Sequence, residues 1–215
     1  MQRDLAWRQF LLILLLMLLP IGLSAQRPDD LVNIKDLDST IIVDLKYATA
    51  DNFLHDTLYA ANICLLRRAV AERLVKVHRT LQAEGLGLKI WDGYRPLSVQ
   101  KKMWQKVPDP RYVADPARGS NHNRGAAVDV TLVDRYGNEL EMPTKFDDFS
   151  PAAASDYPYG SATARKNRER LKQAMRSQGF RATSSEWWHF NAHDCKKYSI
   201  LDVPLEQFAR SHRQN

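Results

Sequence analysis

One histidine and one aspartate stand seven residues apart around a glycine in the segment SNHNRGAAVD, residues 120–129. Neutral imidazole and ionised carboxylate are both ligands that zinc accepts in proteins. Gly125 allows a sharp turn after His122, and the apolar run at 127–132 predicts a strand that carries Asp129. The segment therefore predicts either half of a metal site or a surface histidine before an edge strand, with Asp129 paired to an arginine.

A second carboxylate and histidine lie downstream in EWWH, residues 186–189. A catalytic zinc uses three protein ligands and keeps one position open, so adding His189 to His122 and Asp129 completes such a set and leaves Glu186 as a base for water. Positions three apart face opposite sides of a regular strand, so we expect a bulge or strong twist here. The alternative is an aromatic core strand with a buried, hydrogen-bonded histidine.

A third motif, WDGYRP at 91–96, contains an arginine between turn-forming residues. Gly93 and Pro96 predict a rigid turn that holds Arg95 in one place. Beside a zinc site, a fixed guanidinium would stabilise the negative charge that amide hydrolysis builds on the carbonyl oxygen. Without such a site, Arg95 would simply pair with Asp92 or another carboxylate.

These three segments, together with DLKYATADNF at 44–53, resemble the zinc D-alanyl-D-alanine dipeptidases, including those that support vancomycin resistance. Four motifs in the same order, spread over 44–190, make the resemblance specific. It implies an α+β fold, in which an antiparallel sheet carries a zinc site with flanking helices. This is the architecture of D-Ala-D-Ala metallopeptidases and hedgehog-type domains.

The resemblance implies a chemical role for each matching residue. One zinc ion per chain would have three ligands: His122, Asp129 and His189. Glu186 would activate water and then protonate the leaving amine, and Arg95 would stabilise the tetrahedral intermediate. His193, four residues after His189, is a rival ligand that we rank below Asp129.

Four further residues match substrate-binding positions of the family. Tyr47 and Asp147 would close the pocket at the amino end of the substrate, and Ser120 would hold its carboxylate. Tyr112 matches less directly, because the connection before Ser120 is slightly longer here than in the family. Each has a local alternative: a packed aromatic ring for Tyr47, an exposed acid for Asp147 and a bond to the turn for Ser120.

The first residues are typical of a secretory signal peptide, which we place at 1–25. Two arginines precede the apolar run at 10–19, and small residues lead to Ala25. The run is shorter than the roughly 20 residues that span a bilayer, although an uncleaved anchor is the alternative. We therefore expect an exported, periplasmic protein with no stable membrane anchor after cleavage, in which 26–215 form a single domain.

Charge and cysteine content narrow the possible partners. The chain has 215 residues and a formal net charge of +6, but its basic residues are spread out and form no nucleic-acid stripe. We expect a small-molecule dipeptide as the partner and no nucleic acid. Cys64 and Cys195 are the only cysteines, and in an exported chain they form either a disulfide or two free buried thiols.

The remaining pattern predicts helices and strands around these motifs. Spacing of apolar residues predicts a long helix over 62–84 with His78 on its surface, and Leu205 begins a tail that we expect to be mobile. The other expected elements are a strand over 41–45, a strand over 88–91, a helix over 98–106, a hairpin of 130–133 with 139–142, a helix over 161–178 and a strand region from Phe180.

The function that follows is zinc-dependent hydrolysis of D-alanyl-D-alanine to two D-alanine molecules, in cell-wall biogenesis or degradation. A close alternative is a D,D-carboxypeptidase or endopeptidase that trims peptidoglycan peptides, which export favours. From another class, the chain is a non-catalytic zinc module that binds cell-wall peptides. Glu186 and Arg95 argue against this last alternative, because a binding module needs neither residue.

Overall fold

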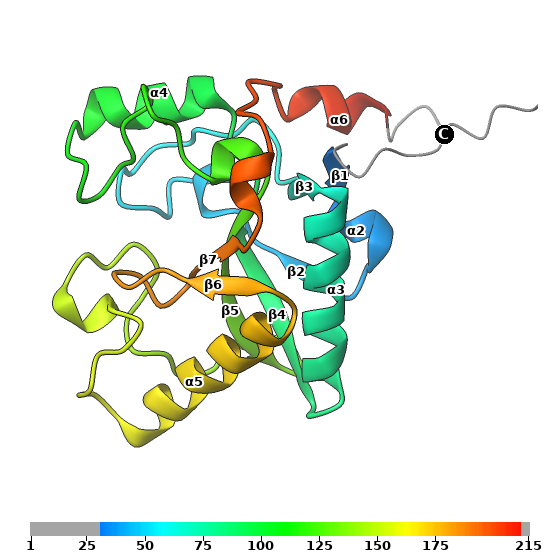
Figure 1. Cartoon of the computed structure of the whole chain (residues 1–215), viewed down its shortest axis with the longest axis vertical. Helices are drawn as coiled ribbons and strands as arrows, with labels where there is room; N and C mark the ends of the chain where they lie inside the picture. Colours follow the sequence, from blue (N-terminus) through cyan, green and yellow to red (C-terminus); the bar gives the residue numbers. More distant parts are fainter. Residues whose placement is uncertain (1–30, 212–215) are drawn as a thin grey trace, which may run out of the picture.

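The sheet that carries the predicted motifs has five strands in the order β2-β4-β5-β7-β6 (Figure 1). A computed structural model describes residues 31–211. The strands are β2 (Ile42–Val43), β4 (Leu86–Asp92), β5 (Ala127–Asp134), β6 (Phe180–Ala182) and β7 (His189–Ala192). Only the β2–β4 pair is parallel among these, and the other three pairs are antiparallel. The α+β fold is confirmed, with a parallel edge strand as its one departure from an antiparallel sheet.

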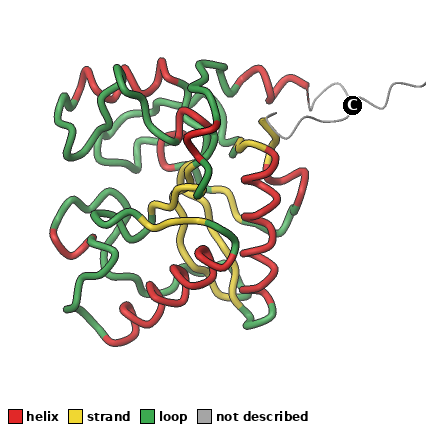
Figure 2. The backbone as a smooth tube through the Cα atoms, viewed as in Figure 1, coloured by secondary structure: helices red, strands yellow, loops and turns green. Residues whose placement is uncertain are grey.

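Helices and long loops cover the two sides of this sheet. The helices are α2 (Ile34–Leu37), α3 (Arg68–Gln82), α4 (Leu97–Lys106), α5 (Ala162–Ser177) and α6 (Glu206–Ser211). Helix α3 packs against β4 and α5, and α5 also packs against β6. Figure 2 shows that the segments between α4 and β5, and between β5 and α5, are mostly loop.

Strand β5 lies between β4 and β7 and is buried on both faces. Val128, Val130 and Leu132 are fully buried in the core. On the other face, Asp129 and Thr131 are also buried. The central strand therefore places a carboxylate in the interior, where it requires partners.

The long helix predicted over 62–84 begins later than expected. Leu65–Arg67 instead forms strand β3, which pairs with β1 (Leu31–Asn33) in a separate two-stranded sheet. The backbone of Tyr94 also donates to the Leu65 carbonyl at 2.8 Å. These bonds come from distant parts of the chain, so the apolar spacing of the segment does not reveal them.

The predicted helices around positions 98–106 and 161–178 are confirmed as α4 and α5. Ser161 caps α5 by accepting from the backbone amide of Ala164. The predicted hairpin has its turn at 134–138, but only one bridge, Val133 to Glu139, follows it. In the described part of the tail predicted from Leu205, Leu205 is buried and α6 follows, so this part is ordered locally in the structure.

The signal peptide predicted at 1–25 lies outside the described residues. Within residues 31–211, no helix combines the length and the apolar composition needed to cross a bilayer.

The two cysteines are both buried and both free, so the disulfide alternative is wrong in this structure. Cys64 packs beside Gly93, where an added Cβ would lie 2.8 Å from the Cys64 sulfur. Burial raises the pKa of the Cys64 thiol far above its ordinary value. Packing of this thiol against the turn before Arg95 explains its burial without a covalent partner.

His78 is buried in the structure, contrary to the surface position that its helix spacing predicts. Its Nδ1 accepts from the backbone amide of Leu88 at 3.0 Å, and its Nε2 lies 3.0 Å from the hydroxyl of Thr40. The absence of a side chain at Gly87 makes room for the ring. His78 therefore joins α3 to β4 and to the turn before β2.

These contacts predict a pH-dependent stability. Burial lowers the pKa of His78; Asp38 opposes this shift, and Arg79 and Lys35 add to it. Because the folded pKa is lowered, the unfolded chain binds the proton first as the pH falls below about 6.5. The contribution of His78 to the free energy of unfolding is therefore complete above that pH and decreases as the pH falls through it.

We expect His78→Ala to lower the free energy of unfolding by about 1–3 kcal/mol near neutral pH, because the amide of Leu88 loses its acceptor. The variant should also lose less stability than the parent between about pH 7.5 and about pH 5.5. Urea unfolding at both pH values measures this, with His193→Ala as a half-exposed histidine control. An equal loss of stability on acidification in parent and His78→Ala would contradict the assignment.

Candidate active site and metal centre

Three predicted ligand residues meet at one end of the five-stranded sheet. His189 Nδ1 lies 2.9 Å from Asp129 Oδ1, and His122 Nε2 lies 3.1 Å from His189 Nδ1 and 3.4 Å from Asp129 Oδ2. Among the described residues, they form the one group of three or more histidine, cysteine, aspartate or glutamate side chains that can share a metal ion. His193 lies elsewhere, against Arg73 and the Gly179 carbonyl.

The donor set fits a zinc ion. Ligand atoms held at about 2.0–2.2 Å from zinc at tetrahedral angles lie about 3.3–3.6 Å apart. His189 Nδ1 lies 2.9 Å from Asp129 Oδ1 and 3.1 Å from His122 Nε2, and His122 Nε2 lies 3.4 Å from the other oxygen of Asp129, all near that range. One ligand atom from each of the three residues lies within 4.8 Å of the others. Burial raises the pKa of Asp129, but the two histidines together lower it by more, so its pKa falls below the ordinary value. The carboxylate is therefore ionised, as a metal ligand requires.

Neighbouring groups orient both histidines. His122 Nδ1 donates to the Gly93 carbonyl at 2.8 Å, which leaves the Nε2 lone pair free. His189 Nε2 donates to the side-chain oxygen of Asn191 at 3.1 Å, which turns its Nδ1 toward Asp129. Sequence reasoning missed Asn191, although its position two residues after His189 places it on the same face of β7.

Gly125 supplies the turn that joins His122 to the sheet. His122–Arg124 forms a single 3₁₀ turn, η2, which ends at Gly125 with φ of +64°. A Cβ at this position would lie 2.7 Å from a side-chain carbon of Leu31. Both the backbone angle and the close packing therefore require glycine here.

Glu186 reaches the site from a turn and not from a strand. The amide of His189 donates to the Glu186 carbonyl at 3.3 Å, so residues 186–189 form a turn just before β7. The Glu186 carboxylate then lies 3.9 Å from His189 Nδ1. The predicted bulge in this segment is therefore wrong; the sheet irregularity is in β4, at Trp91 between Ile90 and Asp92.

The electrostatic setting of Glu186 suits a group that exchanges protons. Burial raises its pKa, and the nearby negative charge of Asp129 raises it further. The histidines and Arg95 act in the opposite direction. A carboxylate with a raised pKa is a stronger base than an exposed one.

Arg95 both pairs with Asp92 and lines the same pocket. Its Nη2 donates to Asp92 at 2.6 Å, and its Nη1 donates to Gln100 at 2.9 Å. Tyr59 also donates to Asp92, at 2.7 Å. The Nε of Arg95 also donates to Asp92, at 3.1 Å. Three of the five guanidinium N–H groups are therefore bonded to Asp92 or Gln100, and the other two are left for a ligand oxygen.

The four predicted substrate-binding residues also line this pocket, whose volume is about 260 Å³. These are Tyr47, Asp147, Ser120 and Tyr112. The Tyr47 hydroxyl donates to the Asp147 carboxylate at 3.1 Å. Asp147 has φ of +56°, a conformation that aspartate tolerates better than most residues. Burial raises the pKa of Asp147 well above its ordinary value, and Asp129 adds to the effect.

Other lining residues gave no signal in the sequence. Phe149 contacts Tyr112, with ring centroids 4.5 Å apart, and both rings are partly exposed at the pocket. Asn121 and Lys196 line the pocket as well. Lys196 comes from a different part of the chain, so only the folded structure brings it to Ser120.

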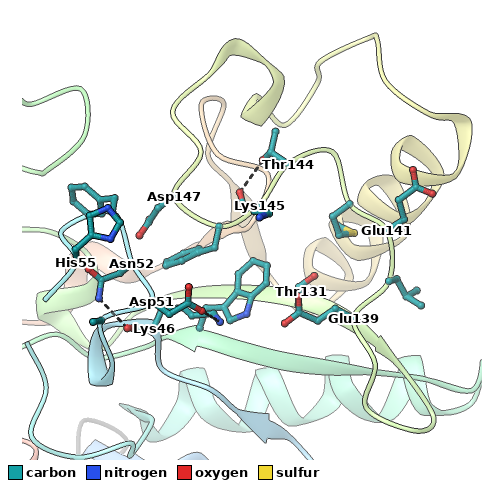
Figure 3. Close-up of a pocket in the computed structure, with 16 residues that line it drawn as sticks. Lys46, Asp51, Asn52, His55, Thr131, Glu139, Glu141, Thr144, Lys145 and Asp147 are labelled. Atoms are coloured by element: carbon teal, nitrogen blue, oxygen red, sulfur yellow. Dashed lines mark hydrogen bonds and ion pairs between the residues drawn. The ribbon is translucent and has the colours of Figure 1, made fainter. Parts of the chain in front are cut away.

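A larger cavity of about 780 Å³ shares Asp147 with the site pocket (Figure 3). Several of its charged side chains pair with other residues of the chain. Lys46 lies 2.8 Å from Asp51, and Glu139 lies 3.0 Å from Lys89. The candidate metal cluster lies in the smaller pocket, so we assign the chemistry there.

Comparison with known proteins agrees with this arrangement. The Peptidase_M15 family model, described as D-ala-D-ala dipeptidase, matches residues 27–210. A D-alanyl-D-alanine dipeptidase of Escherichia coli (strain K12) is 39% identical over 172 residues, which cover 80% of this chain and 89% of that protein.

Two further relatives with the same description give the same result. One from Enterococcus faecium is 31% identical over 186 residues, covering 76% of this chain and 92% of that protein. One from Streptomyces coelicolor is 32% identical over 188 residues, covering 75% of this chain and 90% of that protein. With a family match over residues 27–210 and relatives aligned over most of its length, the chain belongs to the Peptidase_M15 family of D-Ala-D-Ala dipeptidases.

Proposed function

We propose that this chain is a zinc metallopeptidase that hydrolyses D-alanyl-D-alanine to two D-alanine molecules. The observation that carries the proposal is the convergence of His122, Asp129 and His189 beside a small pocket that also holds Glu186 and Arg95. The relatives described as D-alanyl-D-alanine dipeptidases support this choice of substrate. We also propose export to the periplasm through residues 1–25.

His122, Asp129 and His189 would hold one zinc ion, which when bound lowers the pKa of water to about 7 and polarises a carbonyl. The Glu186 carboxylate takes a proton from the attacking water and then passes it to the leaving amine. The two uncommitted N–H groups of Arg95 stabilise the negative charge that forms on the carbonyl oxygen. Asp92 and Gln100 hold the guanidinium in position while this charge develops.

Tyr47 and Asp147 would bind the amino end of the dipeptide. A buried carboxylate without a cation is unfavourable, and burial accordingly raises the pKa of Asp147. The ammonium of a dipeptide would offset this cost by pairing with Asp147. The relatives described as D-alanyl-D-alanine dipeptidases favour a dipeptide over the longer peptides that a wall-trimming carboxypeptidase takes.

We expect the purified protein to contain about one zinc ion per chain. His122→Ala and His189→Ala should each lose most of it, because two ligands hold zinc much more weakly than three. Elemental analysis after dialysis measures the content, and His193→Ala is the matched control. Loss of zinc in His193→Ala, with full retention in the other two variants, would overturn the ligand set.

Glu186→Gln should keep its zinc, since this side chain is not in the ligand set, but should lose the proton-transfer step. Loss of a general base typically costs about 10²–10⁴-fold in rate. Turnover of D-Ala-D-Ala measures the loss, and Glu141→Gln in the larger cavity is the control. Near-normal turnover by Glu186→Gln would rule out this mechanism.

N-acetyl-D-Ala-D-Ala should be a far poorer substrate than D-Ala-D-Ala, because it leaves Asp147 buried without a cation. Breaking a buried pair costs about 3–5 kcal/mol, or roughly two to three and a half orders of magnitude in kcat/KM. Release of D-alanine from both substrates measures the ratio, and Asp147→Asn should reduce it. Similar kcat/KM values for the two substrates would favour the carboxypeptidase instead.

A further inference from the structure

Lys196 lies in a short 3₁₀ turn, η4 (Cys195–Lys197), shortly after the strand that carries His189. Its side chain lines the site pocket together with Gly119, Ser120 and Asn121. The Nζ donates to the side-chain oxygen of Asn121 at 3.2 Å. The ammonium of Lys196 is thus held beside the residues that precede His122.

The positive charge of Lys196 is not neutralised within the described part of the chain, where no carboxylate oxygen lies within 4.0 Å of its Nζ. The neighbouring Lys197 differs, because it lies 2.7 Å from Asp194. Arg95, the other cation at the pocket, is already paired with Asp92. Lys196 is therefore the cation best placed to meet an anionic group of a ligand.

Ser120 supplies a second group of the right kind. Its hydroxyl oxygen accepts from the amide of His122 at 3.2 Å, so the hydroxyl hydrogen can still be donated to a ligand. The acidic groups Asp147 and Glu186 belong to other segments of the pocket, and Asp147 is bonded to Tyr47. The pocket thus offers both an acid and a cation to a ligand that carries opposite charges at its two ends.

We propose that Lys196 binds the free carboxylate of the dipeptide together with Ser120, and so restricts the enzyme to substrates with a free carboxyl end. The inference deepens the proposed function and rests on it. A charged hydrogen bond between ammonium and carboxylate is stronger than a neutral one. Lys196 would act in binding, in both the ground state and the transition state, and not in proton transfer.

Lys196 is connected to a proposed zinc ligand, so a variant must be checked for metal content. Asn121 donates to the side-chain oxygen of Asn191 at 2.7 Å, and His189 lies 3.1 Å from the same oxygen. The bond between the two asparagines does not involve the Lys196 ammonium. Lys196→Gln should therefore retain zinc, and its amide can still donate to Asn121.

The test compares Lys196→Gln with Lys197→Gln on D-Ala-D-Ala and on D-Ala-D-Ala amide. We expect Lys196→Gln to lose about tenfold or more in kcat/KM on the free acid, mainly through KM. On the amide, which lacks the negative charge, parent and Lys196→Gln should agree within about twofold. Lys197→Gln should match the parent on both, because its charge faces Asp194. Equal losses on acid and amide, or no loss on the acid, would overturn the proposal.

Binding provides a readout that does not depend on turnover. Calorimetry should detect binding of D-Ala-D-Ala to zinc-loaded Glu186→Gln. Adding the substitution Lys196→Gln should weaken the affinity for D-Ala-D-Ala about tenfold or more and leave the affinity for D-Ala-D-Ala amide unchanged. If the parent binds the dipeptide but releases no D-alanine, the proposed function is refuted. The binding comparison with and without Lys196→Gln would then still test the role of Lys196. Failure of Lys196→Gln to change dipeptide binding would refute the role of Lys196 alone.

Discussion

The antiparallel pairing of β5 with β7 places Asp129 directly opposite His189, and the rest of the site depends on this register. Residues directly opposite in an antiparallel pair have Cβ atoms about 4.5–5.5 Å apart, so two ligands converge without any loop. A slip of one residue would turn Asp129 to the face of the sheet that Val128 and Val130 occupy in this structure. The third ligand, His122, then needs only the turn at Gly125 to return to the same place.

Buried charges in the site are compensated to different degrees. Asp129 lies between two histidines, and Asp92 accepts from Arg95 and Tyr59. Asp147 has a hydroxyl partner but no cation within salt-bridge distance among the described residues. A buried carboxylate in this state costs free energy, and a ligand ammonium can recover part of it. This unpaired state of Asp147 is what the proposed binding of the substrate ammonium requires.

Regular strands and the loops between them carry different parts of the site. Two paired strands and one 3₁₀ turn hold the proposed metal ligands, which need accurate placement. Loops and short 3₁₀ turns carry the residues that we propose bind the substrate: Tyr47 and Asp147 at one end, and Ser120 and Lys196 at the other. Loops change more readily than strands, so relatives with the same metal chemistry can differ in the peptide end that they recognise.

The sequence alone determined the proposed metal ligands, the positions of Glu186 and Arg95, and several of the main elements. The His122–Gly125–Asp129 spacing, EWWH and the arginine motif predicted side chains that the structure places at one pocket, and apolar periodicity predicted α4 and α5. Only the tertiary structure decided the turn that aims Glu186, the burial of His78, the free state of both cysteines and the position of Lys196. The reason is physical: periodicity and turn chemistry act within a few residues, whereas strand pairing, burial and ion pairing depend on contacts between distant segments.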